Sequence, residues 1–142
     1  MYHKITLIGN LGRDPEMRYT PSGQAVTNFS MATTEKWTGQ DGNLQERTLW
    51  WRVSVFGKMA ETTNTYLKKG SKVYIEGRVT GDPKTGGPRI FTRQDGTTGT
   101  SFEVTANTVK FLSSRGETGA APGGGGPAEH EPMAEESDEI PF

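Results

Sequence analysis

The amino-acid sequence predicts an all-β domain followed by a disordered, acidic C-terminal tail. The prediction depends on short runs rich in Val, Ile, Thr and aromatic residues, on turn residues that bound most of these runs, and on a change of composition near residue 113. No apolar run approaches the roughly 18 to 20 residues of a membrane helix, and the first residues lack the apolar stretch of a secretory signal. We therefore expect a soluble, cytoplasmic protein.

Five strands and one helix are predicted in order along the body of the chain. The strands are expected at residues 4–8, 25–34, 48–56, 72–80 and 101–111. The helix is expected at 58–69, where Ala60, Thr63 and Leu67 share one face. Lys68 and Lys69 suit the negative end of the helix dipole, and Gly70 suits the residue that follows a helix.

A helix between strands three and four of five is the element order of a five-stranded Greek-key barrel of the OB (oligonucleotide/oligosaccharide-binding) fold, although other small barrels share it. The body, residues 1–112, holds 15 Lys and Arg against 10 Asp and Glu. Residues 113–142, rich in Gly and Pro, hold one Arg and seven acids and bury too little apolar area to fold. This division predicts a folded domain at 1–112 and a disordered tail at 113–142, with nucleic-acid contact by the basic body.

The third predicted strand carries the most informative pattern. Successive side chains of a strand point to opposite faces, so Leu49, Trp51, Val53 and Val55 share one face and Trp50, Arg52, Ser54 and Phe56 share the other. Two large rings beside a guanidinium form a platform for stacking bases and neutralising phosphates. The alternative is that Trp50 and Phe56 pack against a helix or a partner subunit.

Two further aromatic residues, Trp37 and Phe91, lie in polar segments where a core residue would be out of place. We expect them on flexible hairpin arms that close over a nucleic-acid strand, although single exposed aromatics also occur without a function. The expected phosphate neighbours in and around these arms are Lys36, Lys84, Arg89 and Arg93, in addition to Arg52.

Four motifs resemble the bacterial single-stranded DNA-binding protein (SSB) family: IGNLGRDPEMRY at 8–19, WWRVSVFGK at 50–58, YLKKGSKVYIEG at 66–77 and DEIPF at 138–142. The resemblance implies an OB-fold homotetramer that stacks bases of single-stranded DNA on Trp37, Trp50 and Phe56, with a fourth aromatic near Phe91. The loop at 82–88 looks longer than the family's usual hairpin. Trp51 stands where a histidine near a subunit contact is familiar.

The resemblance also gives the tail a role. The family's C-terminus docks on replication, recombination and repair proteins, and the matching tip here consists of Asp138, Glu139, Ile140, Pro141 and Phe142. The acids would meet basic residues of the partner, and the ring and carboxylate of Phe142 would enter a small pocket. The alternative is a tail that only solubilises the protein, against which the apolar Ile-Pro-Phe end argues.

Other classes of function find less support in the sequence. Gly123 to Gly126 do not form a phosphate-binding loop, His3 and His130 lie far apart, and the chain has no Cys, so we predict no catalytic residues, metal or cofactor. An RNA-binding or primosomal OB protein would need no acidic tip, and an oligomeric adaptor would need no aromatic face. We expect the protein to be located in the bacterial cytoplasm, in association with the nucleoid.

Overall fold

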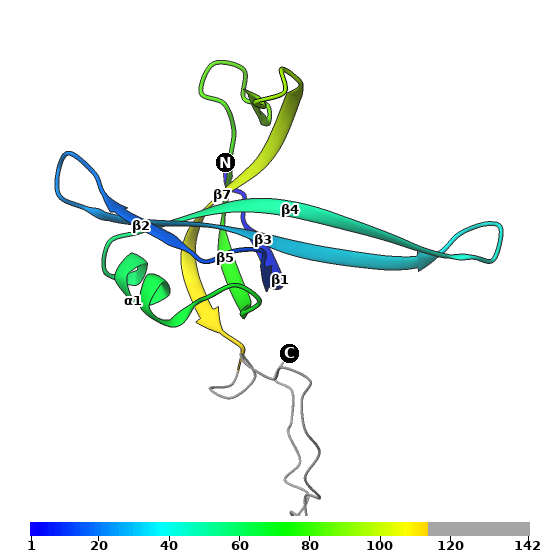
Figure 1. Ribbon diagram of the computed structural model, residues 1–142, viewed down its shortest axis with the longest axis horizontal. Coiled ribbons are helices and arrows are strands. Elements are labelled where there is room, and N and C mark those ends of the chain that lie inside the picture. The colour runs from blue at the N-terminus through cyan, green and yellow to red at the C-terminus, as the bar shows by residue number, and fades with distance from the viewer. Residues whose placement is uncertain (114–142) are drawn as a thin grey trace, which may run out of the picture.

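A computed structural model describes residues 1–113 and shows a closed barrel with an added helix and two extra strands (Figure 1). Five strands form the barrel: β1 (Ile5–Leu11), β3 (Ala25–Thr38), β4 (Leu44–Phe56), β5 (Lys72–Thr80) and β7 (Thr98–Phe111). They pair in the order β1-β5-β7-β4-β3, and β3 pairs again with β1 to close the ring. The β4–β7 pair is parallel and the others are antiparallel. The predicted five-stranded OB barrel is confirmed.

The backbones of β1 and β3 approach closely where the barrel closes, and this approach requires a glycine at position 9. Asn10 pairs with Ala32 and Leu11 with Met31, the two pairs that join β1 to β3. A Cβ on Gly9 would collide with the carbonyl oxygen of Ala32. Only glycine therefore allows β1 to reach β3 at this point.

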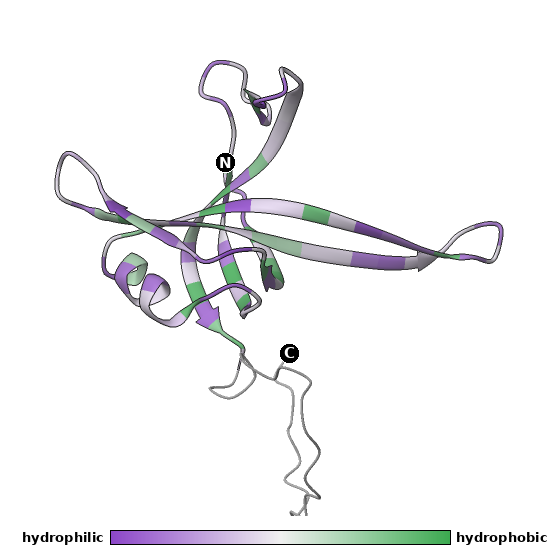
Figure 2. Cartoon of the chain, viewed as in Figure 1, coloured by the Kyte–Doolittle hydropathy of each residue, from purple (hydrophilic) through white to green (hydrophobic). Residues whose placement is uncertain are grey.

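The core fills the barrel with side chains from each of its strands. Val53 and Val55 of β4 are fully buried, as are Val73 and Ile75 of β5 and Met31 of β3. Hydrophobic and hydrophilic residues alternate along these strands in Figure 2, as expected when one face of a sheet meets the core.

The helix α1 (Lys58–Tyr66) lies between β4 and β5, as predicted, but it ends three residues before the expected Lys69. Leu67 leaves the helix with φ −90° and ψ 146°, and its side chain is buried in the core. Gly70, with φ +86°, forms part of the turn that leads into β5 rather than following the helix directly. Burial of Leu67 therefore overrides the local signals that favoured a longer helix.

Two strands of four residues each were not predicted. Strand β2 (Glu16–Tyr19) pairs with β3, and β6 (Arg89–Thr92) pairs with the start of β7. Every residue of β6 is exposed, so this strand lacks the hydrophobic alternation by which a half-buried strand is recognised. The β6–β7 hairpin and the long β3–β4 ribbon project beyond the barrel in different directions (Figure 1).

The structure does not test the predicted tail. Of residues 113–142, only Ser113 is described, and its Oγ accepts a hydrogen bond of 2.6 Å from the backbone N–H of Lys72. The tip Asp138–Phe142 lies outside the described residues.

The helix is tied to the barrel by a buried hydrogen bond that can be tested. Thr27 is fully buried, and its Oγ1 donates to the carbonyl oxygen of Ala60 over 2.6 Å. Thr27→Val leaves that carbonyl without this donor, so we expect the free energy of unfolding to fall by about 1–2 kcal/mol. Urea unfolding followed by circular dichroism, at one protein concentration, measures the change.

Thr65→Val is the matched control, because the Thr65 hydroxyl donates to the Glu61 carbonyl on the exposed side of α1. A loss of stability no larger for Thr27→Val than for Thr65→Val would contradict this account of how the helix is held.

Candidate nucleic-acid interface

The two faces of β4 have the predicted composition. Val53 and Val55 point into the core, whereas 55% of the Trp50 surface and 42% of the Phe56 surface are exposed. Arg52 lies between these rings and is also exposed. The β4 face outside the barrel therefore offers two rings and a guanidinium to solvent.

A groove of about 380 Å³ lies between this face and the β6–β7 hairpin. It is lined by Arg13, Ser30, Trp50, Trp51, Arg52, Phe91, Arg93, Thr100 and Ser101. Four predicted binding residues thus lie together, from two segments about 40 residues apart. They are Trp50, Arg52, Phe91 and Arg93. We call this the aromatic groove.

Sequence reasoning missed Arg13, the third arginine of the aromatic groove. It lies two residues after the end of β1, and the β1–β3 closure brings it toward the outer face of β3, where Ser30 lies opposite Arg52. Its only signal was a basic residue inside the first motif, and no local pattern related that motif to Trp50.

Two glycines lie directly against the groove's aromatic rings. A Cβ on Gly12 would come within 2.5 Å of Cζ3 of Trp50, and a Cβ on Gly99 would come within 2.7 Å of Cζ of Phe91. The backbone at each glycine therefore fills the space beside the ring, which limits where the ring can move.

Arg93 lies over the ring of Phe91, with its guanidinium carbon 5.5 Å from the ring centroid. Its Nη1 also donates to the carbonyl oxygen of Thr98 over 3.0 Å, which holds the guanidinium at the turn of the hairpin. This cation–π arrangement places a positive charge beside a flat apolar surface.

Trp37 does not join the aromatic groove. In the unbroken register of β3 and β4, Ala32 lies opposite Trp50, whereas Trp37 lies opposite Gln45. Alternation from these pairs puts Trp37 on the ribbon face opposite to Trp50, the face that also carries Trp51. The ribbon projects from the barrel, so the Trp37 ring remains 43% exposed.

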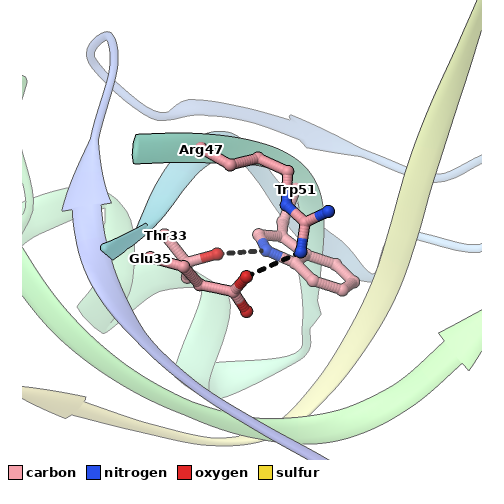
Figure 3. Close-up of polar contacts among 4 residues, drawn as sticks. All are labelled: Thr33, Glu35, Arg47 and Trp51. Atoms are coloured by element: carbon pink, nitrogen blue, oxygen red, sulfur yellow. Dashed lines mark hydrogen bonds and ion pairs between the residues drawn. The ribbon is translucent and has the colours of Figure 1, made fainter. Parts of the chain in front are cut away.

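That second face of the ribbon carries its own polar and aromatic contacts (Figure 3). Arg47 donates to Glu35 over 2.9 Å, and its guanidinium carbon lies 5.4 Å from the Trp37 ring centroid. Trp51 Nε1 donates to Thr33 Oγ1 over 2.9 Å. The Trp51 ring packs on Phe102 with centroids 5.4 Å apart, so Trp51 serves packing, as its place on the core side of β4 predicts.

A polar row separates Arg52 from Phe56. Glu16, Asn28 and Ser54 lie opposite one another across β2, β3 and β4, and they share the face of Trp50 and Phe56. Ser54 Oγ donates to Asn28 Oδ1 over 2.7 Å. A smaller cavity of about 130 Å³ lies at this polar row, and its lining residues are Glu16, Met17, Arg18, Asn28 and Arg52.

The remaining predicted phosphate neighbours lie outside the aromatic groove. Lys36 pairs with Glu46 at 3.3 Å on the ribbon, and Arg89 pairs with Glu103 at 3.6 Å beside the hairpin. Lys84 is exposed in the loop before β6. The Lys36–Glu46 pair is exposed on both sides and contributes little free energy, so another anion can compete for Lys36.

Another group of charge interactions lies on β5 and at the residue before β1, away from the groove. Lys4 Nζ lies 2.6 Å from Glu76 Oε2, and the Tyr74 hydroxyl donates to Glu76 Oε1. These bonds lower the pKa of Glu76 and raise the pKa of Lys4 and Tyr74. Tyr74 is therefore engaged on another wall of the barrel and takes no part in the groove.

Residues 1–113 show neither a metal centre nor a membrane helix. Within that range, no three or more His, Asp and Glu side chains come together to hold an ion. No helix among the described residues is long and apolar enough to cross a bilayer.

A closed five-stranded barrel with aromatic and basic side chains on its strand face defines an OB-fold protein of the oligonucleotide-binding class. The model of the Single-strand binding protein family matches residues 2–112. The chain belongs to this family.

Curated relatives agree with the family match. A single-stranded DNA-binding protein of Neisseria meningitidis serogroup A is 45% identical over 121 residues, which cover 84% of this chain and 66% of the relative. One from Xanthomonas axonopodis pv. citri is 46% identical over 115 residues, which cover 81% of this chain and 60% of the relative. The chain thus matches slightly less than two thirds of each relative's length.

Solved structures share the fold. The Plasmodium falciparum SSB in complex with ssDNA superimposes with a TM-score of 0.65 at 26% identity, over 80% of this chain and 97% of that one. A deletion mutant of the single-stranded DNA binding protein from Thermus aquaticus gives a TM-score of 0.61 at 29% identity, over 80% of this chain and 51% of that one.

The glycine contacts generate a prediction about ring placement. Gly12→Ala introduces a methyl group where the Trp50 ring now lies, so the ring must move. In protein labelled with fluorotryptophan, we expect the ¹⁹F resonance of Trp50, assigned with Trp50→Phe, to shift.

Gly87→Ala is the control, because a Cβ on Gly87 meets only Thr85 Oγ1 at 3.6 Å. Identical ¹⁹F spectra for the wild type and Gly12→Ala would show that Gly12 does not position the ring.

Proposed function

We propose that this protein binds single-stranded DNA with little sequence preference, protects it, and keeps it free of secondary structure during replication, recombination and repair. The observation that carries the proposal is the aromatic groove, in which Trp50 and Phe91 come together with three arginines. Family membership and the curated relatives' names support the same function.

Stacking supplies the base contacts in this proposal. Trp50 and Phe91 line the groove on the barrel and on the hairpin, so a base entering it meets aromatic surface from both. Each stack contributes about 1–3 kcal/mol, whatever the base, because every base has a π face. Arg13, Arg52 and Arg93 neutralise the adjacent phosphates, which makes binding weaker at high salt.

The face of β4 extends the binding path beyond the groove. Trp50, Arg52 and Phe56 occupy alternate positions, so the two rings lie six residues apart, a span of about 20 Å along the strand. Trp37 lies on the other ribbon face, so DNA that stacks on all four aromatic residues passes around the ribbon's edge. Lys36, Lys84 and Arg89 line the outer parts of this path.

The mechanism needs no chemical turnover. A base that stacks on a ring is removed from pairing, so the bound strand cannot form hairpins while it is held. A duplex hides the faces of its bases and therefore cannot use the stacking sites. We propose a binding protein without catalytic residues, cofactor or metal.

The proposed assembly is a homotetramer in the bacterial cytoplasm, associated with the nucleoid. Apolar side chains outside the groove support further burial between subunits, among them Ile8 and Phe111, which are 54% and 40% exposed. Trp51 packs on the exposed Phe102. This aromatic pair supports the proposed assembly, because Trp51 stands where the family resemblance implies a histidine near a subunit contact.

The acidic segment Asp138–Phe142 is proposed to recruit proteins of replication, recombination and repair. Its acids suit a basic partner surface, and Ile140 and Phe142 supply apolar contacts. The rival functions are an RNA-binding or primosomal OB protein and an oligomeric adaptor, and neither requires both the groove and this tip.

Removing the Trp50 ring tests the stacking site. Trp50→Ala is expected to weaken binding of oligo(dT) by roughly 1–3 kcal/mol, because one base loses its stack. Fluorescence anisotropy of labelled oligo(dT), with duplex DNA and oligo(U) of equal length as comparators, measures the loss and separates DNA binding from RNA binding.

Tyr2→Ala, which removes an exposed ring outside the groove, is the matched control and should bind like the wild type. Normal binding by Trp50→Ala would refute the stacking site. Failure of the wild-type protein to bind any single strand would leave the adaptor function.

Deleting Phe142 tests the recruiting segment separately. We expect the truncated protein to bind oligo(dT) as tightly as the full chain, because the aromatic groove is intact. Each form is immobilised on single-stranded DNA and incubated with a bacterial lysate, and the captured proteins are identified by mass spectrometry. The truncated protein should fail to capture the replication and repair proteins that the full chain captures. Capture of the same proteins by both forms would show that the tip is not the recruiting segment.

A further inference from the structure

We infer that Asp14 is a positioning residue of the aromatic groove. Its carboxylate holds the segment between β1 and β2 on the turn before β5, and this contact places Arg13 beside the bound strand. The inference rests on the proposed single-stranded DNA binding and adds to it a residue that acts through a neighbour. The groove lining includes Arg13 but not Asp14.

The position of the Arg13 side chain depends on the backbone that carries it. The side chain is exposed, and within residues 1–113 it makes neither an ion pair nor a hydrogen bond. Arg93 differs, because its guanidinium donates to the Thr98 carbonyl. Residues 12–14 therefore decide where the Arg13 guanidinium can meet a phosphate.

Gly12 fixes the backbone on the N-terminal side of Arg13. Its N–H donates to the Ser30 carbonyl on β3 over 3.0 Å. A Cβ on Gly12 would come within 2.5 Å of the Trp50 ring, so the backbone here lies directly against the groove's central aromatic residue. The peptide that enters Arg13 is thus held at the wall of the groove.

Asp14 fixes the backbone on the other side of Arg13. Its Oδ1 accepts a hydrogen bond of 2.8 Å from the backbone N–H of Lys69, which lies 55 residues further along the chain. Pro15 follows Asp14 and restricts its backbone to extended conformations. The carboxylate therefore joins the segment that carries Arg13 to the turn at 69–71.

That turn is attached to β1 by contacts that do not involve Asp14. The Leu11 N–H donates to the Ser71 carbonyl over 3.0 Å, and the Leu11 carbonyl accepts from the Gly70 N–H over 2.9 Å. Asn10 Nδ2 donates to the Gly70 carbonyl over 3.0 Å. Leu11 and Ser71 are both buried. The turn is therefore a fixed support for the Asp14 carboxylate.

Charge alone would not favour an acid at this position. Asp14 adjoins Arg13 in the sequence, and its carboxylate repels the phosphates that Arg13 attracts. If charge were its whole effect, every neutral substitution would tighten binding. A role as hydrogen-bond acceptor predicts instead that binding weakens when the substituted residue cannot accept.

The test compares Asp14→Ala with Asp14→Asn in the full-length protein, by fluorescence anisotropy of labelled oligo(dT) over a series of salt concentrations. Both variants lose the same charge, but Asn keeps an oxygen that accepts from a backbone N–H about as well as Asp does. We expect Asp14→Ala to bind about fivefold more weakly than the wild type at low salt. Asp14→Asn should bind at least as tightly as the wild type.

Arg13→Ala shows whether Asp14 acts through Arg13. It removes one phosphate contact, so the slope of log association constant against log salt should become less negative by about 0.7. In the Arg13→Ala background, Asp14→Ala should change the affinity by less than about twofold, because residues that act through one contact are not additive.

Glu61→Ala removes a carboxylate from α1, away from the groove, and should leave the affinity unchanged. Asp14 is exposed, so circular dichroism should show each variant folded under the binding conditions. Equal affinities for Asp14→Ala and Asp14→Asn would overturn the positioning role, as would an equal loss with and without Arg13. Failure of the wild type to bind oligo(dT) would instead overturn the proposed function.

Discussion

The pairing of β1 with β3 is the constraint on which the rest of the structure depends. It closes the barrel, so each of the five barrel strands has a neighbour on both sides. It requires a glycine at position 9, because any side chain there would meet the backbone of β3. It also carries the residues after β1, including Gly12 and Arg13, to the outer face where Trp50 lies. Closure thus stabilises the fold and assembles one side of the groove.

The barrel supports a surface that combines rigid and projecting parts. Trp50 and Phe56 stand on β4, whose alternate residues Val53 and Val55 are locked in the core. Phe91 stands on β6, every residue of which is exposed, and the hairpin joins the barrel through β7. A stacking surface built in this way has one fixed wall and one wall that projects from the barrel. Such an arrangement suits a long, flexible ligand that is held by several similar contacts.

Local patterns predicted the elements and the composition of their faces, and they were wrong where burial or pairing intervened. The alternation of β4 placed Trp50 and Arg52 correctly, because strand geometry alone decides which residues share a face. The end of the helix was wrong because Leu67 is buried in the core. Strands β2 and β6 were missed because they are short and are formed by pairing with neighbours. Trp37 was expected on a hairpin arm, and the register of β3 and β4 adds that it lies on the ribbon face opposite to Trp50.

The sequence by itself determined the order of the strands, the position of the helix and the outward placement of Trp50, Arg52 and Phe56, since these follow from periodicity within single segments. Only the tertiary structure decided that Arg13, Trp50 and Phe91 line one groove, because these residues come from three segments that barrel closure and hairpin pairing bring together. The polar row of Glu16, Asn28 and Ser54 arises in the same way. Its members are unremarkable in their own segments, and the relation between them exists only in the register of three strands.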